Sequence, residues 1–255
     1  MSRRSVATDD LALPGWLRGL YDSARRTAPA TPGLDGRPAG TRPRRGTEPG
    51  RHSAVLLMFS GESWEDGQLL LTHRSPSMRS HAGQVAFPGG RVDPGDRDVI
   101  DTALREAAEE TGLDRAGVTP LLTLPDAHTH RGASVSPVLA WSPTPGRVWA
   151  ASPEETDHVF YCSLPELVRP ENRLMVGRRH PRTGAPWRGP AFWAEGYLVW
   201  GFTAGVLAGV LAAGGWEDAW DRDTTYPLAE MIRRSRNNEK LNDDHRGPRG
   251  GKINE

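Results

Sequence analysis

The sequence predicts a mixed α/β (α+β) domain, because strand-like runs and helical stretches follow one another without regular alternation. The length of 255 residues suffices for one sizeable core or at most two small domains. One strongly amphipathic helical stretch also follows a glycine-rich loop. The expected strands are short and rich in branched or aromatic residues, at 54–59, 68–72, 119–124, 134–141, 158–162, 191–194 and 197–200.

Composition divides the chain into three parts. Apolar residues recur at helical spacing over residues 15–26, and the rest of 1–50 is rich in Pro, Gly, Arg and Thr, which indicates a helix followed by a linker. The core domain is expected over 51–231. Residues 232–255 are charged, contain many Asn and Gly residues, and predict a disordered tail.

An apolar stretch near the end of the core raises the question of a membrane span. Residues 197–213 reach only the short end of the length that a bilayer requires. A buried strand followed by a buried helix over 203–213, begun by Thr203 and ended by Gly214-Gly215, explains the stretch better. The N-terminus lacks the apolar segment of a secretory signal, so we expect a cytoplasmic protein with no membrane partner.

Charge and cysteine content exclude several classes of protein. The chain has 32 Lys and Arg against 32 Asp and Glu, which gives no reason to expect a nucleic-acid partner. Cys162 is the single cysteine, so neither an intrachain disulfide nor a cysteine zinc site can form. We expect it to be a buried, inert thiol.

The helical stretch has clear ends and two chemically different faces. Asp98 or Asp101 can cap its start, and Gly112 stands where a helix-ending glycine belongs. At about 100° per residue, one side is apolar and the other is charged. The apolar side holds Ile100, Ala103, Leu104, Ala107, Ala108 and Thr111, and the charged side holds Arg105, Glu106, Glu109 and Glu110.

The acidic cluster disfavours the helix unless a cation binds to it. Like charges at i,i+4, such as Glu106 and Glu110, cost about 0.2–0.5 kcal/mol per pair. Acids near a helix C-terminus oppose the macrodipole by a comparable amount. Hard divalent cations such as Mg²⁺ prefer carboxylate oxygens and substrate phosphates. The preceding run Phe87-Pro88-Gly89-Gly90 allows a close approach of the backbone to phosphate, so the segment predicts a diphosphate clamp.

These residues resemble the Nudix box, Gly-x5-Glu-x7-Arg-Glu-(apolar)-x-Glu-Glu-x-Gly-(apolar). The first Glu of the box is replaced by Asp96, and the gap from Asp96 to Arg105 is one residue longer. Both departures lie before or at the helix start, so the acidic face survives. The matching positions are Gly90, Arg105, Glu106, Ala107, Glu109, Glu110, Gly112 and Leu113.

The segment upstream is similar to the second motif of the coenzyme A pyrophosphatase branch of the family. That motif reads Leu-Leu-Thr-x-Arg-(Ser/Ala)-x3-Arg-x3-Gly-x3-Phe-Pro-Gly-Gly, and residues 70–90 fit every fixed position. Residues 154–160 and 200–204 also look like later family segments. The resemblance covers roughly residues 52–213.

The resemblance implies an α/β/α sandwich around a mixed sheet and hydrolysis of coenzyme A at its diphosphate. It implies Mg²⁺ or Mn²⁺ on Glu106, Glu109 and Glu110, with Glu109 acting as a ligand or as the base on the attacking water. Arg105 would brace the loop and the carboxylates, and Glu155 would be a further acid from a later loop.

Substrate recognition is expected just before the glycine run. Arginines suit phosphate, and the neighbouring polar side chains can donate hydrogen bonds. The expected partner is thus a small-molecule diphosphate, and a homodimer is possible. The candidate substrate-binding residues are Arg74, Arg79, His81, Gln84, Gly89 and Gly90.

Two alternatives remain open at this point. ADP-ribose, a dinucleotide polyphosphate or a capped RNA end would use the same carboxylates. A Nudix-fold sensor would bind a nucleotide without cutting it, but such a protein would be expected to lose acidic residues of the box, and Glu106, Glu109 and Glu110 are all present.

Overall fold

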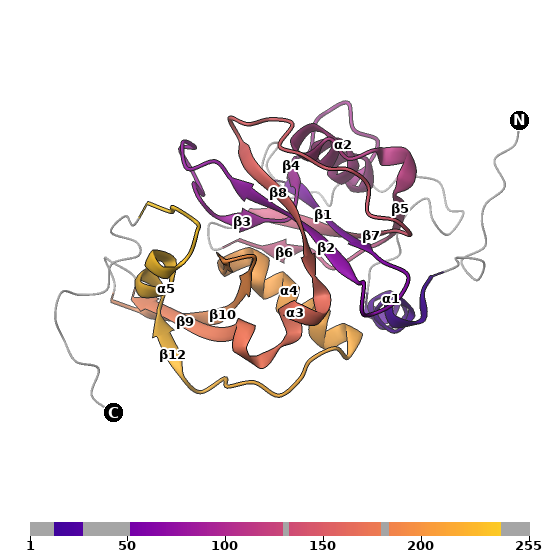
Figure 1. Cartoon of the computed structure of the whole chain (residues 1–255). Coiled ribbons are helices and arrows are strands. Elements are labelled where there is room, and N and C mark those ends of the chain that lie inside the picture. Colours follow the sequence, from indigo (N-terminus) through magenta and orange to yellow (C-terminus); the bar gives the residue numbers. More distant parts are fainter. Residues whose placement is uncertain (1–12, 28–51, 130–132, 180–183, 241–255) are drawn as a thin grey trace, which may run out of the picture.

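The computed structural model describes residues 13–27, 52–129, 133–179 and 184–240, in which two sheets and five α-helices are found (Figure 1). The first sheet has eight strands: β1 (His52–Ser60), β2 (Gln68–Arg74), β3 (Val85–Ala86), β4 (Gly89–Arg91), β5 (Thr119–Thr123), β6 (Ala127–His128), β7 (Ser134–Ser142) and β8 (Thr156–Ser163). Their order is β3-β2-β1-β7-β5, with β4 beside β1, β6 beside β7 and β8 beside β2. The sheet is mixed, because β1 runs antiparallel to β2 and parallel to β7.

The second sheet has four strands in the order β11-β10-β9-β12. Its strands are β9 (Arg173–Arg179), β10 (Pro186–Ala194), β11 (Tyr197–Val199) and β12 (Thr225–Pro227). The helices are α1 (Gly15–Thr27), α2 (Val99–Thr111), α3 (Leu164–Val168), α4 (Gly201–Gly214) and α5 (Leu228–Arg234), with 3₁₀ turns at Arg115–Gly117 and Pro170–Asn172.

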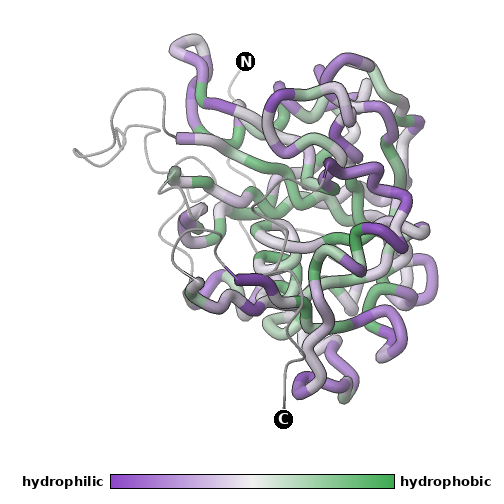
Figure 2. Tube along the Cα trace, turned by 90° about the vertical axis from the view of Figure 1, so that its left-hand side faces the viewer, coloured by the Kyte–Doolittle hydropathy of each residue, from purple (hydrophilic) through white to green (hydrophobic). Residues whose placement is uncertain are grey.

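Strand β1 lies at the centre of the sandwich and buries both of its faces. Successive side chains of a strand point to opposite faces of the sheet. Ala54, Leu56 and Met58 pack toward α2, whereas Leu57 and Phe59 pack toward α1 and α4. The expected α/β/α sandwich is therefore observed, with hydrophobic residues along the inner strands and hydrophilic residues in the outer loops (Figure 2).

The second sheet forms a smaller core with α5. Leu174 and Val176 of β9 pack with Leu228, Met231 and Ile232 of this helix. Figure 1 shows this sheet and α5 in the part of the molecule remote from α2. Strand β9 and helix α5 were not predicted from the sequence, whereas every strand that was predicted is observed within a few residues of its expected limits.

The apolar stretch near the end of the core forms β11 and α4, as expected. The start of the helix differs from the prediction, because Trp200 is the N-cap and Thr203 donates its hydroxyl to the Val85 carbonyl oxygen instead (3.1 Å). Its end is as predicted, with Gly215 in the left-handed conformation. Among the described residues, we find no helix with the length and hydropathy needed to cross a membrane.

The segment after α5 differs from the expected tail. Asn237 and Glu239 are buried, because they form hydrogen bonds to β11 and to the loop after β2. The prediction of disorder is therefore wrong for residues 232–240, and its remainder, 241–255, lies outside the described residues. The predicted linker over 28–50 also lies outside them.

The single cysteine is buried in the main core, as expected. Cys162 on β8 is 2% exposed, and burial raises the pKa of its thiol to about 12. Because only the thiolate is a strong nucleophile, this thiol is inert at neutral pH.

Candidate active site

Helix α2 begins and ends at the residues that the sequence indicates. The Asp98 side chain accepts a hydrogen bond from the Asp101 backbone N–H (2.9 Å), which caps the start of the helix. Gly112 ends it with a φ of 65°, and its N–H donates to the Ala108 carbonyl oxygen. These two caps fix how α2 presents its acidic residues to the glycine run.

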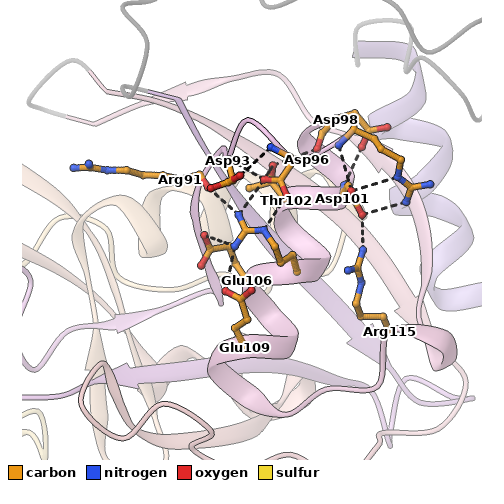
Figure 3. A network of polar contacts seen from close by, with 12 residues as sticks. Arg91, Asp93, Asp96, Asp98, Asp101, Thr102, Glu106, Glu109 and Arg115 are labelled. Atoms are coloured by element: carbon orange, nitrogen blue, oxygen red, sulfur yellow. Dashed lines mark hydrogen bonds and ion pairs between the residues drawn. The ribbon is translucent and has the colours of Figure 1, made fainter.

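Arg105 links the carboxylates of α2 to the loop before the helix. Figure 3 shows Asp96 of this loop and Glu106 and Glu109 of the helix in one network of polar contacts. Its guanidinium donates two hydrogen bonds to Asp96, of 2.8 and 2.9 Å, and a third to the Arg91 carbonyl oxygen. One nitrogen also lies 3.0 Å from Glu106 Oε1 and 3.1 Å from Glu109 Oε2. This ion pair lowers the pKa of Asp96 and raises that of Arg105. The shorter Asp96 therefore shapes the loop by binding Arg105.

Glu110 is buried, which corrects its expected place on the charged side of the helix. Its side chain accepts a hydrogen bond from the Gly89 N–H (3.1 Å) and lies 3.9 Å from Arg74. Position 110 lies at the border of the two faces, and these partners draw its side chain inward. The pKa of Glu110 is raised to about 7, mainly by burial, and the charges of Glu106 and Glu155 act in the same direction.

Negative charge at this site exceeds the positive charge that compensates it. Glu106 is half-buried, and burial is the largest cause that raises its pKa. Repulsion from Glu109 and from Glu155 acts in the same direction. The candidate acid Glu155 thus lies within electrostatic reach of both Glu106 and Glu110.

The two glycines of the loop permit the close packing of α2 against it. A Cβ atom at Gly90 would lie 2.5 Å from a carboxylate oxygen of Glu106, and one at Gly89 would lie 2.3 Å from the Ala54 carbonyl oxygen. Gly89 also has a φ of 157°. Any larger side chain would therefore collide with Glu106 of α2 at position 90 and with the backbone of β1 at position 89.

The residues fit a hard divalent cation in donor type and in charge. Glu106, Glu109 and Glu110 offer oxygen donors, and burial together with neighbouring carboxylates raises the pKa values of Glu106 and Glu110. In the part of the chain that the structure describes, no three acidic, His or Cys side chains are gathered closely enough to hold a metal ion as they stand. Arg105 contacts two of the carboxylates, and Gly89 engages the third.

Four of the candidate substrate residues lie in the loop that joins β2 to β3 or at its start, namely Arg74, Arg79, His81 and Gln84. This loop is closed by two backbone hydrogen bonds, from Arg74 N–H to the Gln84 carbonyl (2.9 Å) and from Gly83 N–H to the Arg74 carbonyl (3.0 Å). His81 has a φ of 56°, and its Nδ1 lies 2.8 Å from Gln84 Oε1. Arg79 is exposed. Of these residues, Arg74 is the one brought against α2.

Sequence reasoning missed several residues that surround this loop. His73 lies between Asp157 Oδ1 (2.5 Å) and the Asn237 carbonyl oxygen (3.0 Å), and Glu239 binds Gln84. His73 occupies the variable position of the upstream motif, so the motif does not select it. Nothing in the polar sequence of residues 235–240 signals that they are buried.

Residues 50–185 match the family described as the NUDIX domain, which is more than half of the chain. The chain belongs to the Nudix family. Its relatives include the Uncharacterized Nudix hydrolase NudL of Shigella flexneri serotype 5b (strain 8401), 39% identical over 170 residues, or 65% of this chain and 85% of the relative. The NudL of Klebsiella pneumoniae (strain 342) is 43% identical over 143 residues, or 54% of this chain and 71% of the relative.

Solved Nudix structures are also similar, although less closely. An Ap4A hydrolase of C. elegans in a binary complex is 24% identical, with 44% of this chain and 80% of that chain covered and a TM-score of 0.37. The NUDIX domain of Shewanella oneidensis NrtR with ADP ribose is 19% identical, with 49% and 80% covered and a TM-score of 0.37. These scores are too low to carry an argument about substrate. The family match shows that the chain is a Nudix pyrophosphohydrolase, and Nudix hydrolases generally use divalent metals such as Mg²⁺ or Mn²⁺.

Proposed function

We propose that this Nudix hydrolase cuts the diphosphate bond of coenzyme A or an acyl-CoA, with release of a phosphopantetheine and adenosine 3',5'-bisphosphate. One observation carries the proposal: residues of the upstream motif, residues 70–90, converge on the carboxylate helix. Arg74 lies 3.9 Å from Glu110, and the Gly89 N–H donates to the same side chain. The motif that resembles the coenzyme A branch and the catalytic helix thus form one site.

In this proposal the acids of α2 hold Mg²⁺ or Mn²⁺ through Glu106, Glu109 and Glu110. When bound there, the cation would neutralise the diphosphate and lower the pKa of a water molecule. Arg105 keeps Glu106 and Glu109 in place through its bonds to Asp96. Glu109, whose side chain is 57% exposed, or Glu155 accepts the proton of the attacking water.

The loop after β2 recognises the phosphates and the non-reacting part of the substrate. Arg74 and Arg79 supply guanidinium groups suited to phosphate oxygens. His81 and Gln84 form a hydrogen-bonded pair that presents polar groups beside them. Gly89 and Gly90 bring the backbone close to Glu110 and Glu106, so that a diphosphate bound at these carboxylates lies beside this segment.

The proposal is tested by a side-by-side assay of the purified protein. Coenzyme A, acetyl-CoA, ADP-ribose and Ap4A are incubated with Mg²⁺ or Mn²⁺, and the products are separated by chromatography. We expect adenosine 3',5'-bisphosphate from the two coenzyme A substrates and no turnover after the addition of EDTA. Cleavage of ADP-ribose or Ap4A without cleavage of coenzyme A would overturn the substrate assignment and leave the Nudix chemistry intact.

A further inference from the structure

The chain segment after α5, residues 236–239, is built into the fold beside β11. The Asn237 side chain accepts a hydrogen bond from the Leu198 N–H (2.8 Å) and donates one to the Leu198 carbonyl oxygen (3.0 Å). The Arg236 N–H donates to the Gly196 carbonyl oxygen (2.9 Å). Asn237 is fully buried and Glu239 is 9% exposed. Because the buried Asn237 amide bonds to both the N–H and the carbonyl oxygen of Leu198, the position of this segment is fixed.

The same segment contacts the substrate loop and the residues beside it through three side-chain groups. Glu239 accepts one hydrogen bond from Gln84 Nε2 (2.8 Å) and another from Trp200 Nε1 (3.0 Å). The Asn237 carbonyl oxygen lies 3.0 Å from Nε2 of His73, the residue before Arg74. These hydrogen bonds therefore join pairs of residues that are 155 and 164 positions apart in the sequence.

The fixed glycine of the upstream motif is explained by this contact. A Cβ atom at Gly83 would lie 2.5 Å from the Asn237 carbonyl oxygen and 2.8 Å from the Glu239 Cα atom. Gly83 also has a φ of 74°, in the left-handed region that favours glycine. The loop is thus shaped to receive the C-terminal segment.

We propose that Glu239 and Asn237 are positioning residues of the substrate site, so that the C-terminal segment sets the affinity for substrate. Glu239 holds the Gln84 side chain, and Gln84 in turn holds His81. The Gln84 backbone pairs with Arg74, the residue that reaches Glu110. The choice of coenzyme A as the substrate in this inference rests on the proposed function. The positioning of the loop by Glu239 and Asn237 does not depend on it.

The first test compares full-length Glu239→Ala and Glu239→Gln with the unaltered protein. Glu239→Ala removes the hydrogen bonds from Gln84 and from Trp200, and the release of the Gln84 side chain should raise KM for coenzyme A about five- to tenfold. We expect kcat to stay within about twofold, because binding is altered and the reacting groups are not. Glu239→Gln keeps an acceptor for Gln84 but places its NH2 group toward Trp200 Nε1, so it should restore part of the affinity. Glu230→Gln, on α5 and away from the loop, is the matched control and should leave KM unchanged.

The second test follows the loop without any substrate. Arg79 is exposed and is the only Arg or Lys among residues 75–84, so trypsin cleavage after it, measured by mass spectrometry, reports on the order of the loop. Glu239→Ala should speed this cleavage severalfold, and Glu239→Gln and Glu230→Gln should not.

Three results would overturn the inference. The first is that Glu239→Ala changes neither KM nor the rate of trypsin cleavage after Arg79. The second is a parallel loss of kcat and of thermal stability, which would show a general structural role. The third is a failure of Glu239→Gln to restore either quantity. If the unaltered protein does not cut coenzyme A, the proposed function fails, and the cleavage after Arg79 still decides the positioning role.

Discussion

Helix α2 and strand β9 both bury charged side chains, but they compensate those charges in different ways. On α2 and in the loop before it, Asp96, Glu106 and Glu109 share the single guanidinium of Arg105. On β9, Arg173 is bound by Glu217, and its guanidinium stacks over Trp220 at 4.6 Å from the ring centroid.

The difference separates a site that lacks positive charge from a site that stabilises the fold. The pKa of Glu110 is raised by burial to about 7, and that of Glu106 is raised for the same reason. A protein tolerates the cost of burying carboxylates at a functional site where a bound cation compensates their charge. Arg173, whose side chain is 0% exposed, has instead a carboxylate and two aromatic rings from its own chain, and these anchor the segment after α4 to the second sheet.

The largest effect is expected from Glu110→Gln. The amide keeps the shape of the side chain and removes the charge, so kcat should fall on the order of a hundred- to a thousandfold. The unfolding temperature of the metal-free protein should stay the same or rise, because an uncompensated buried charge is removed. Steady-state kinetics and thermal unfolding measure the two effects. Near-normal turnover would show that α2 does not carry the chemistry.

The contrast between the two regions also decides what the sequence can predict. Helix α2 follows from local signals, since its apolar period, Asp98 and Gly112 all lie within one segment. The burial of Glu110 depends on Gly89, which is 21 positions earlier, and no helical projection contains that partner. The acidic patch was therefore found, whereas the inward turn of one of its members was not.

Strand β9 was missed because its sequence lacks the usual pattern of a strand. Residues 173–179 contain three arginines and a glycine, and the burial of Arg173 depends on Glu217, 44 positions later. The burial of Asn237 and Glu239 has the same cause, since their partners lie 39 and 155 positions away. Composition alone makes such residues look like a surface or a tail.

Glu217→Gln tests the stabilising role of the pair in the second region. Removal of one partner from a buried ion pair costs about 3 kcal/mol or more, because the other charge is left buried. Urea denaturation should show this loss in the free energy of unfolding. The double variant Arg173→Met/Glu217→Gln should recover much of it, since neither charge remains. A loss below about 1 kcal/mol would mean that Arg173 does not depend on Glu217.

Asp101→Asn tests a compensated carboxylate at the start of α2. The pKa of Asp101 is lowered to about 2, with the hydrogen bond from the Arg97 side chain as the largest cause and that from Arg115 acting in the same direction. A lowered pKa in the folded state stabilises the protein above the unfolded value near 4, and this contribution is lost as the pH falls toward 2. With screening by solvent around the exposed Arg97, we expect a loss of about 1–2 kcal/mol at pH 7.

Denaturation at a series of pH values measures that loss. The free energies of unfolding of the unaltered protein and of Asp101→Asn should converge near pH 2. A difference that stays constant between pH 7 and pH 2 would assign the effect to the shape of the side chain and not to its charge.

The smallest effect is expected from Glu230→Gln on α5, which sharpens the comparison within the second region. Glu230 lies only 2.6 Å from Arg234, but the two side chains are 41% and 64% exposed. Exposed pairs at i,i+4 stabilise a helix by about 0.3–0.5 kcal/mol, and salt screens them. Urea denaturation at low and at high salt should therefore show a small loss that disappears at about 1 M NaCl. A loss as large as that of Glu217→Gln would show that the distance between charges, and not their burial, governs these pairs.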